Sequence, residues 1–208
     1  MNKNIPSFLL LCIFYSGVFA EDKLDIELKD ISFETPPGSM SPHLSTSKSN
    51  VTILNWLEPI DDGHRIQFSK FDSEWASPSS VTQGNDWFIN WADFPSVINF
   101  NENEYAAHWL QKSGEATYAY DAYISISKND GKSWSQPIKA HNDNTQTEHG
   151  FLSFYEHENE LGFIYLDGRK MVNEVTHDMS HSSMSLRSGT INENLILINT
   201  QNIDGLVC

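Results

Sequence analysis

The chain has 208 residues, a formal net charge of −15 and an isoelectric point near 4.7. This length allows one domain with a substantial core, or two small ones, and the six Trp and 12% aromatic residues exclude a disordered acidic tail. The acidity excludes nucleic acid as a partner, because the chain would repel its phosphates.

Residues 1–20 have the features of a signal peptide. Lys3 precedes an apolar run over residues 8–19, and Val-Phe-Ala before Glu21 resembles a cleavage site. The run is too short to span a membrane. We therefore expect a secreted or periplasmic protein that has no membrane contact after cleavage. Residues 21–40 are then expected to form an N-terminal extension.

A sequence unit recurs three times from residue 41 onward. Residues 42–57 and 95–110 both begin with Pro and end with Trp-Leu, and residues 151–166 form a third copy. Each copy contains a short alternating strand, a polar turn and a more apolar strand. Such self-similarity at a fixed period is typical of repeat architectures.

The second half of the unit also recurs. Residues 68–78 ("FSKFDSEWASP") match residues 126–137 ("ISKNDGKSWSQP"), and residues 184–200 occupy the same place in the third unit. Each unit thus predicts four short strands, and no segment has sustained helical periodicity. We predict an all-β fold, a partial β-propeller of about three four-stranded blades. The expected blades cover residues 41–84, 94–143 and 149–200.

One turn of the second unit has a distinctive set of residues. Gly131 allows a positive φ, the polar side chains can bind the turn's own amides, and the Trp can fill the gap between adjacent sheets. The turn closely resembles the Asp-box, or BNR repeat, of sialidase-like β-propellers, with a degenerate copy at Ser69, Asp72 and Trp75. The expected structural residues are Ser127, Asn129, Gly131, Ser133 and Trp134.

The resemblance covers residues 41–208, through segments such as "DWFINWADFPS", "TEHGF" and "YLDGRK". In these segments the chain resembles secreted bacterial sialidase-like proteins. That family generally has six blades, so the resemblance implies that more chain follows Cys208 and that this sequence is an N-terminal fragment. A half-ring that dimerises is the alternative.

Candidate site residues follow from propeller geometry, because the links between blades and the loops between the second and third strands of a blade emerge on one face. Trp rings stack on sugars and Asp accepts hydroxyl hydrogen bonds, although the Trp rings can also pack between blades. A carboxylate beside an imidazole can act as acid and base, or the two can anchor a loop. The candidate catalytic residues are Asp93, Glu148 and His149, and the candidate ligand-binding residues are Asp86, Trp87, Trp91, Tyr120, Asp167 and Arg169.

Two further features have competing interpretations. Arg169 can hold a ligand carboxylate bidentately, or it can pair with Asp167 to hold its loop. His177 and His181 are spaced to share a metal on a helix, but the segment is rich in Ser and no third ligand is identifiable. We therefore expect no metal and no cofactor.

The resemblance implies a glycoside hydrolase acting on acidic sugars, similar to an exo-α-sialidase. Such enzymes are implied to use three Arg, a Tyr nucleophile with a Glu, and an Asp acid/base. The chain departs from this pattern, because "HRIQF" around Arg65 has Gln67 where Pro is expected. The alternative is a non-catalytic propeller that binds a glycan, a peptide or another small acidic ligand, or that serves as a scaffold. The oligomeric state is left open.

Overall fold

The computed structural model describes residues 27–157, 160–172, 183–192 and 197–203. The chain divides into two units, residues 1–32 and 33–208, and within the first only residues 27–32 are described, without regular secondary structure. The predicted signal peptide, His177, His181 and Cys208 lie outside the described residues. Among the described residues no helix is long and apolar enough to cross a membrane.

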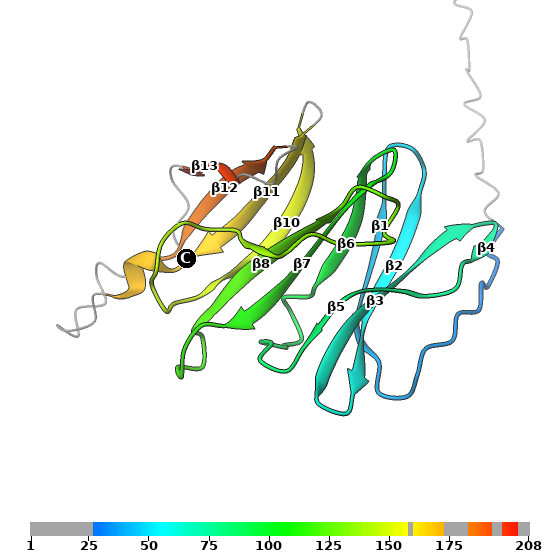
Figure 1. Cartoon of the computed structure of the whole chain (residues 1–208), viewed down its shortest axis with the longest axis horizontal. Coiled ribbons are helices and arrows are strands. Elements are labelled where there is room, and N and C mark those ends of the chain that lie inside the picture. Colours follow the sequence, from blue (N-terminus) through cyan, green and yellow to red (C-terminus); the bar gives the residue numbers. More distant parts are fainter. Residues whose placement is uncertain (1–26, 158–159, 173–182, 193–196, 204–208) are drawn as a thin grey trace, which may run out of the picture. The chain divides into compact units, whose positions relative to one another are not determined.

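The second unit consists of three antiparallel sheets that follow one another along the chain (Figure 1). The first sheet contains β1 (Met40–Thr46), β2 (Thr52–Ile60), β3 (Gly63–Asp72), β4 (Glu74–Trp75) and β5 (Ser79–Gly84). The second contains β6 (Ser96–Asn101), β7 (Glu104–Lys112), β8 (Tyr120–Ser127) and β9 (Ile138–Lys139). The third contains β10 (His149–His157), β11 (Glu160–Asp167), β12 (Ser185–Ile191) and β13 (Leu197–Asn202), with a 3-10 turn, η1 (Arg169–Val172), after β11.

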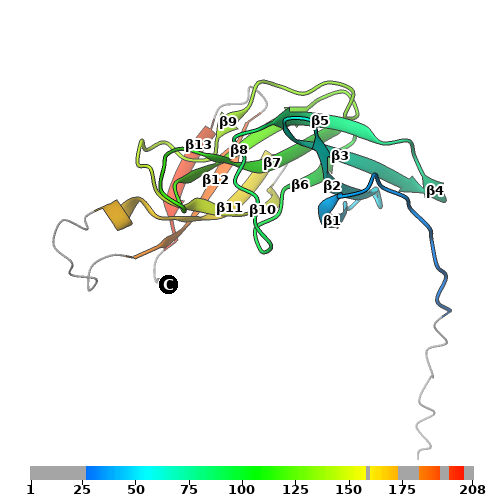
Figure 2. The ribbon, with the colours of Figure 1, turned by 90° about the horizontal axis from the view of Figure 1, so that it is seen from below.

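Neighbouring sheets pack against each other through shared apolar cores, and Figure 2 shows the same sheets from below. The predicted all-β partial propeller of three blades is confirmed. In the first blade the fourth strand is split into β4 and β5, which both pair with β3. Pro78 lies in the gap between them. Because Pro has no N–H to donate, it cannot continue the ladder there.

Each pair of neighbouring blades encloses its own apolar core. Phe68 and Trp109 belong to the core between the first and second blades, and Phe163 and Tyr165 belong to the core between the second and third. The middle blade is covered on both faces, so β7 is buried at six successive positions. A blade cannot hide its apolar faces alone, which is why the sequence unit has to recur.

Asn55 on β2 joins the first blade to the second. Its side chain is fully buried, its Nδ2 donates to the carbonyl oxygen of Pro95 at 2.9 Å, and its Oδ1 accepts from the amide of Val97 at 2.9 Å. An Asn is needed here because its amide group is both donor and acceptor.

We expect Asn55→Ala to lower the free energy of unfolding by about 3 kcal/mol, because it leaves two buried backbone groups unpaired. The measurement is urea denaturation at neutral pH. Ser45→Ala is the control, since Ser45 Oγ makes one half-buried bond to the Val97 carbonyl oxygen at 2.9 Å and its loss should cost about 1 kcal/mol. Equal costs for the two variants would contradict the role assigned to Asn55.

The turn between β8 and β9 closes on itself through its own side chains. Ser127 Oγ accepts from the amide of Gly131 at 2.9 Å, and Asn129 Oδ1 accepts from the amide of Ser133 at 2.9 Å. Gly131 has φ 78°, and an added Cβ would lie 2.5 Å from Cζ of Phe68. The Trp134 ring meets Phe68 edge to face with centroids 6.0 Å apart. The turn therefore packs the second blade against the first.

Candidate functional site

Three chemically active side chains meet at the junction of the second and third blades. Asp93 precedes β6, Tyr120 begins β8, and Glu148 precedes β10. The Tyr120 hydroxyl donates to Glu148 Oε1 at 2.7 Å. We call Asp93, Tyr120 and Glu148 the acid–tyrosine cluster. Asp93 lies in the link between the first two blades, and Glu148 lies in the link between the second and third blades. Propeller geometry places both links, and the start of β8 at Tyr120, on the same face.

The segment Gly150–Phe151 holds Asp93 against this cluster. The amide of Phe151 donates to Asp93 Oδ2 at 2.6 Å, and Phe151 has φ 50°. An added Cβ at Gly150 would lie 2.4 Å from Asp93 Oδ2 and 3.2 Å from the Tyr120 hydroxyl oxygen. Only a glycine therefore allows the two side chains to approach this backbone so closely.

The environment of Asp93 favours its protonated form. Burial raises the pKa of Asp93 to about 6, the Phe151 amide partly opposes this shift, and the negative charge of Glu148 adds to it. Asp93 is only 4% exposed. A carboxyl group with a pKa near 6 is matched to the task of a general acid, which must hold a proton close to the working pH.

A groove of about 650 Å³ runs beside the first strands of all three blades, β1, β6 and β10, and Asp93 lines it. Phe151, which is 45% exposed, lines the same groove. Trp91, two residues before Asp93, is 88% exposed. Phe88 stacks on Tyr120 with ring centroids 4.0 Å apart. The carboxyl group therefore has aromatic surface close by, of the kind on which sugar rings stack.

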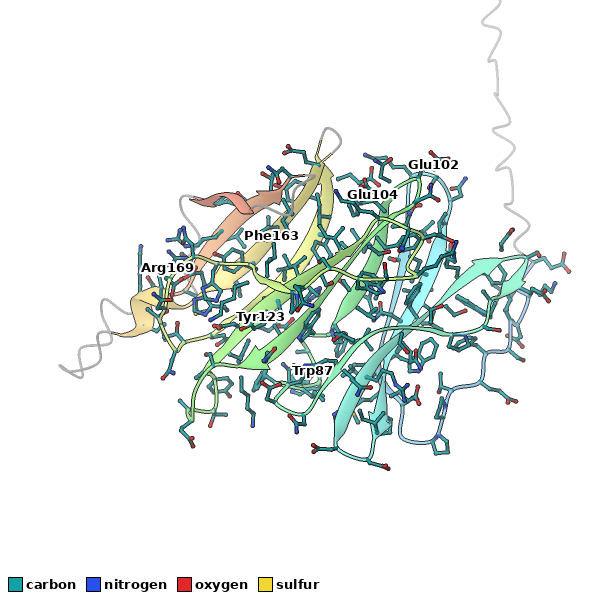
Figure 3. All side chains as sticks on the ribbon, in the orientation of Figure 1. Trp87, Glu102, Glu104, Tyr123, Phe163 and Arg169 are labelled. Atoms are coloured by element: carbon teal, nitrogen blue, oxygen red, sulfur yellow. The ribbon has the colours of Figure 1, made fainter. Side chains whose placement is uncertain are left out.

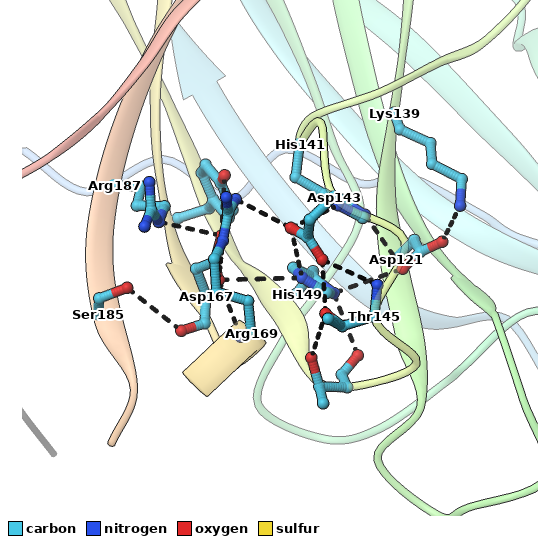
Figure 4. Close-up of polar contacts among 12 residues, drawn as sticks. Asp121, Lys139, His141, Asp143, Thr145, His149, Asp167, Arg169, Ser185 and Arg187 are labelled. Atoms are coloured by element: carbon cyan, nitrogen blue, oxygen red, sulfur yellow. Dashed lines mark hydrogen bonds and ion pairs between the residues drawn. The ribbon is translucent and has the colours of Figure 1, made fainter. Parts of the chain in front are cut away.

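A second set of polar residues lies where β8, β9, β10 and β11 end or begin (Figure 4). Both His141 and His149 have side chains that are 0% exposed, and their rings stack with centroids 3.8 Å apart and an angle of 3° between their planes. We call the whole set the charged network. Its members are Asp121, Lys139, His141, Asp143, His149, Asp167, Arg169 and Arg187.

Opposite charges compensate one another in the charged network. Burial by itself would raise the pKa of Asp121, but its close approach to His141, His149 and Lys139 outweighs burial and lowers it. Burial likewise acts to raise the pKa of Asp143, but Thr145, His149 and Arg169 hold it at about 2. The carboxylates of the network are therefore ionised at neutral pH.

The structure divides the predicted site residues into two groups. Asp93, Tyr120 and Glu148 form the acid–tyrosine cluster, whereas His149, Asp167 and Arg169 belong to the charged network. His141 and Lys139 were missed by sequence reasoning. The spacing His141-x-Asp143 ahead of His149, within a single link, was the signal that could have pointed to them.

Three predicted ligand contacts lie outside both groups. Trp87, labelled in Figure 3, is only 9% exposed. It packs on Trp109 with ring centroids 6.0 Å apart, so its ring is not accessible to a ligand. Trp91 is accessible. Asp86 accepts a hydrogen bond from Gln111 at 2.7 Å on the exposed surface.

Arg169 pairs with Asp167, which is the second of the two interpretations that the sequence left open. Its Nη2 lies 2.6 Å from Asp167 Oδ2 and 2.9 Å from Asp143 Oδ2, and its Nε donates to Asp167 Oδ1 at 2.8 Å. The guanidinium group therefore already has two carboxylate partners and does not face a ligand carboxylate.

No protein-family model and no curated protein sequence matches the chain. Among solved structures, it is similar to a Penicillium chrysogenum α-L-arabinanase complexed with arabinobiose, at 15% identity over 78% of this chain and 49% of that one, with a TM-score of 0.53. A GH93 α-L-arabinofuranosidase of Fusarium graminearum complexed with arabinobiose matches at 11% identity over 81% and 51%, with a TM-score of 0.51. A protein of unknown function from Dyadobacter fermentans matches at 11% identity over 78% and 54%, with a TM-score of 0.51.

The chain spans about half the length of the structures that it matches. At these identities the similarity shows the fold alone. The narrower resemblance to sialidase-like proteins stays a prediction, because two of these structures are an α-L-arabinanase and an α-L-arabinofuranosidase, the third is of unknown function, and none is described as a sialidase. The described part of the chain is thus a set of three β-propeller blades with the fold that these glycoside hydrolases use.

Proposed function

We propose that this protein is a glycoside hydrolase in which Asp93 and Glu148 act as the acid and base pair. The observation that carries the proposal is the acid–tyrosine cluster itself: a buried carboxyl group that lines the groove, beside a second carboxylate held by the Tyr120 hydroxyl. Burial raises the pKa of the first carboxyl group, that of Asp93, to about 6. Two carboxyl groups with different environments, one protonated and one ionised, are the usual requirement for glycoside hydrolysis.

In this proposal Asp93 in its protonated form donates its proton to the glycosidic oxygen as the bond to the leaving sugar breaks. Glu148 in its ionised form stabilises the positive charge that develops on the sugar ring and takes the proton of the attacking water. The Tyr120 hydroxyl, 2.7 Å from Glu148 Oε1, orients that carboxylate. Trp91 and Phe151 provide exposed aromatic faces for sugar rings near the acid.

A neutral sugar fits this site better than an acidic one. Arg169 is saturated by Asp143 and Asp167, and a substrate carboxylate beside Glu148 and Asp93 would be repelled. Two similar structures hold arabinobiose, a neutral disaccharide. Neutral pentose glycosides are therefore the first class to assay, and acidic sugars such as sialosides are the second. We also propose that the protein is exported through the signal peptide predicted at residues 1–20, which would bring it to extracellular polysaccharide.

The test is hydrolysis of fluorogenic glycosides by the purified protein at pH 5, with arabinofuranosides, xylosides and sialosides assayed in parallel. We expect release from a neutral pentoside and a fall of about 10²–10⁴-fold in kcat/KM for Glu148→Gln. Glu74→Gln is the matched control, since it makes the same change at an exposed residue of β4 on the first blade and should leave the rate unchanged. Binding of oligosaccharides without release of any product would reject the hydrolase and favour the alternative of a non-catalytic glycan-binding propeller.

A further inference from the structure

The stacked rings of His141 and His149 have more acceptor oxygens around their nitrogens than two neutral rings have N–H groups to donate. His141 Nδ1 lies 3.2 Å from Asp143 Oδ2, and its Nε2 lies 3.0 Å from Asp121 Oδ1. His149 Nδ1 lies 3.4 Å from Asp121 Oδ1, and its Nε2 lies 3.4 Å from Asp143 Oδ2. All four ring nitrogens therefore face oxygen atoms that only accept.

Two neutral imidazole rings carry only two N–H groups between them. These two protons satisfy the hydrogen bonds of His141 Nδ1 to Asp143 and of His149 Nδ1 to the Thr147 carbonyl oxygen. The two buried Nε2 atoms then have no proton to share with the carboxylate oxygens beside them, which is unfavourable. Protonating both rings would satisfy all four contacts, but it would place two positive charges face to face with ring centroids 3.8 Å apart. The buried atoms His141 Nε2, His149 Nε2 and Asp121 Oδ1 indeed have no hydrogen-bond partner of acceptable geometry.

A divalent cation bound by the inner nitrogens, His141 Nε2 and His149 Nδ1, and by Asp121 would remove this conflict. Because the lone pair of an imidazole nitrogen lies in the plane of its ring, such an ion requires one ring to turn out of the parallel stack. Asp121 Oδ1, His141 Nε2 and a nitrogen of His149 lie close enough together to serve as ligands of one ion. Ligands of a tetrahedral zinc ion lie about 3.3 Å apart, and the two printed separations from Asp121 Oδ1 are 3.0 and 3.4 Å. We propose that Asp121, His141 and His149 form a binding site for a divalent transition-metal ion of the zinc class.

The outer nitrogens support the same assignment. With the inner nitrogens on the metal, His141 Nδ1 and His149 Nε2 both carry protons, and both face Asp143 Oδ2. A carboxylate that accepts from the outer N–H of a metal-binding histidine is a recurrent arrangement that sets the tautomer and the orientation of the ring. Asp143 is held in turn by the Thr145 hydroxyl at 2.5 Å and by Arg169 at 2.9 Å.

The ligating carboxylate also has an outer partner, because Lys139 Nζ lies 2.5 Å from Asp121 Oδ2. The carbonyl oxygen of Thr147 lies 3.1 Å from His149 Nδ1 and can supply a fourth ligand. The donor set of two imidazoles, a carboxylate and a carbonyl suits zinc and neighbouring divalent metals.

The metal would fasten the link between the second and third blades. Asp121 lies on β8, His141 follows β9 and His149 begins β10, so one ion would join three strands and both ends of residues 141–149. Glu148, the proposed base, immediately precedes a ligand. The site is separate from the acid–tyrosine cluster, and its existence does not depend on hydrolytic activity.

The test is the metal content of the protein, measured by mass spectrometry after purification without chelators and again after incubation with zinc. We expect about one metal ion per chain, a lower melting temperature after removal with a chelator, and recovery of that temperature when zinc is added back. His141→Ala and Asp121→Asn should lose the ion, and Asp143→Asn should bind it about 10–100-fold more weakly. His64→Ala, on the first blade and outside the network, is the matched control.

Cobalt loading of the wild-type protein keeps the test independent of how the variants fold. Cobalt held by nitrogen and oxygen ligands in a tetrahedral site should give visible absorption that zinc displaces. A wild-type chain that takes up no stoichiometric zinc or cobalt, and whose melting temperature is unaffected by zinc or chelator, would overturn the proposal. The His pair would then be a doubly protonated ion-pair network.

Discussion

Asp93→Asn is expected to slow hydrolysis by about 10²–10⁴-fold and, at the same time, to make the folded protein more stable at neutral pH. The pKa of Asp93 is raised from 3.8 to about 6 in the folded protein. Between these two values the carboxyl group ionises in the unfolded chain but stays protonated in the folded one. Folding stability therefore falls as the pH rises through this window, by at most about 3 kcal/mol.

Asn escapes this loss, because it is neutral at every pH and its side-chain oxygen can still accept the hydrogen bond of the Phe151 amide. The measurement is the free energy of unfolding in urea at pH 4 and pH 7.5 for both proteins. We expect the variant to match the wild type at pH 4 and to be the more stable of the two at pH 7.5. A variant that is destabilised at pH 7.5 would show that the Asp93 carboxylate is a structural group.

The activity of the same variant tests the role of Asp93 as the acid. A general acid contributes about 10²–10⁴-fold to a rate, so kcat/KM should fall by that factor in Asp93→Asn. In the wild type, kcat/KM should decline as the pH rises above about 6, and that decline should be absent from any residual activity of the variant. An unchanged pH profile would remove Asp93 from the mechanism.

Asp167→Ala is expected to destabilise the protein by about 3–5 kcal/mol, because it removes a fully buried carboxylate that pairs with two largely buried arginines, of which Arg169 keeps Asp143 as a partner. Asp167 is 0% exposed. Its carboxylate binds the Arg169 side chain through both oxygens and also lies 3.2 Å from Nε of Arg187. The side chain of Arg187 is only 13% exposed, so water cannot replace the lost oxygen atoms.

The measurement for Asp167→Ala is urea denaturation at neutral pH, together with Lys48→Met as the matched control. Lys48 pairs with Glu156, and its side chain is 80% exposed. An exposed ion pair contributes about 0–1 kcal/mol, so this control should change stability little. Similar costs for the two variants would mean that burial does not set the strength of the Asp167 ion pairs.

The propeller fold was predictable because it follows from spacing along the chain. In the second and third blades, successive strands pair with their sequence neighbours, so Trp109 and Tyr165 take equivalent places in their sheets when the sequence unit recurs. The turn from Ser127 to Trp134 was predictable for the same reason. Its hydrogen bonds join residues at most four apart.

The candidate site was predictable only in part. The rule that links between blades emerge on one face selected Asp93 and Glu148, and the structure brings both close to Tyr120. The same rule did not indicate the direction in which a side chain of a link points. Trp87, predicted to contact a ligand, instead packs on Trp109 in the core. The rule also did not indicate that Arg169 is occupied by Asp143 and Asp167.

The sequence by itself determined the number of blades in this chain, their strand order and the segments that form their rims, because these depend on local pairing and periodic burial. Only the tertiary structure decided which rim residues touch. The stacking of His141 on His149, and their approach to Asp121 twenty residues or more away along the chain, depend on how two blades pack. Packing between blades is a property of side-chain shape in three dimensions, and it leaves no periodic signal in the order of the residues.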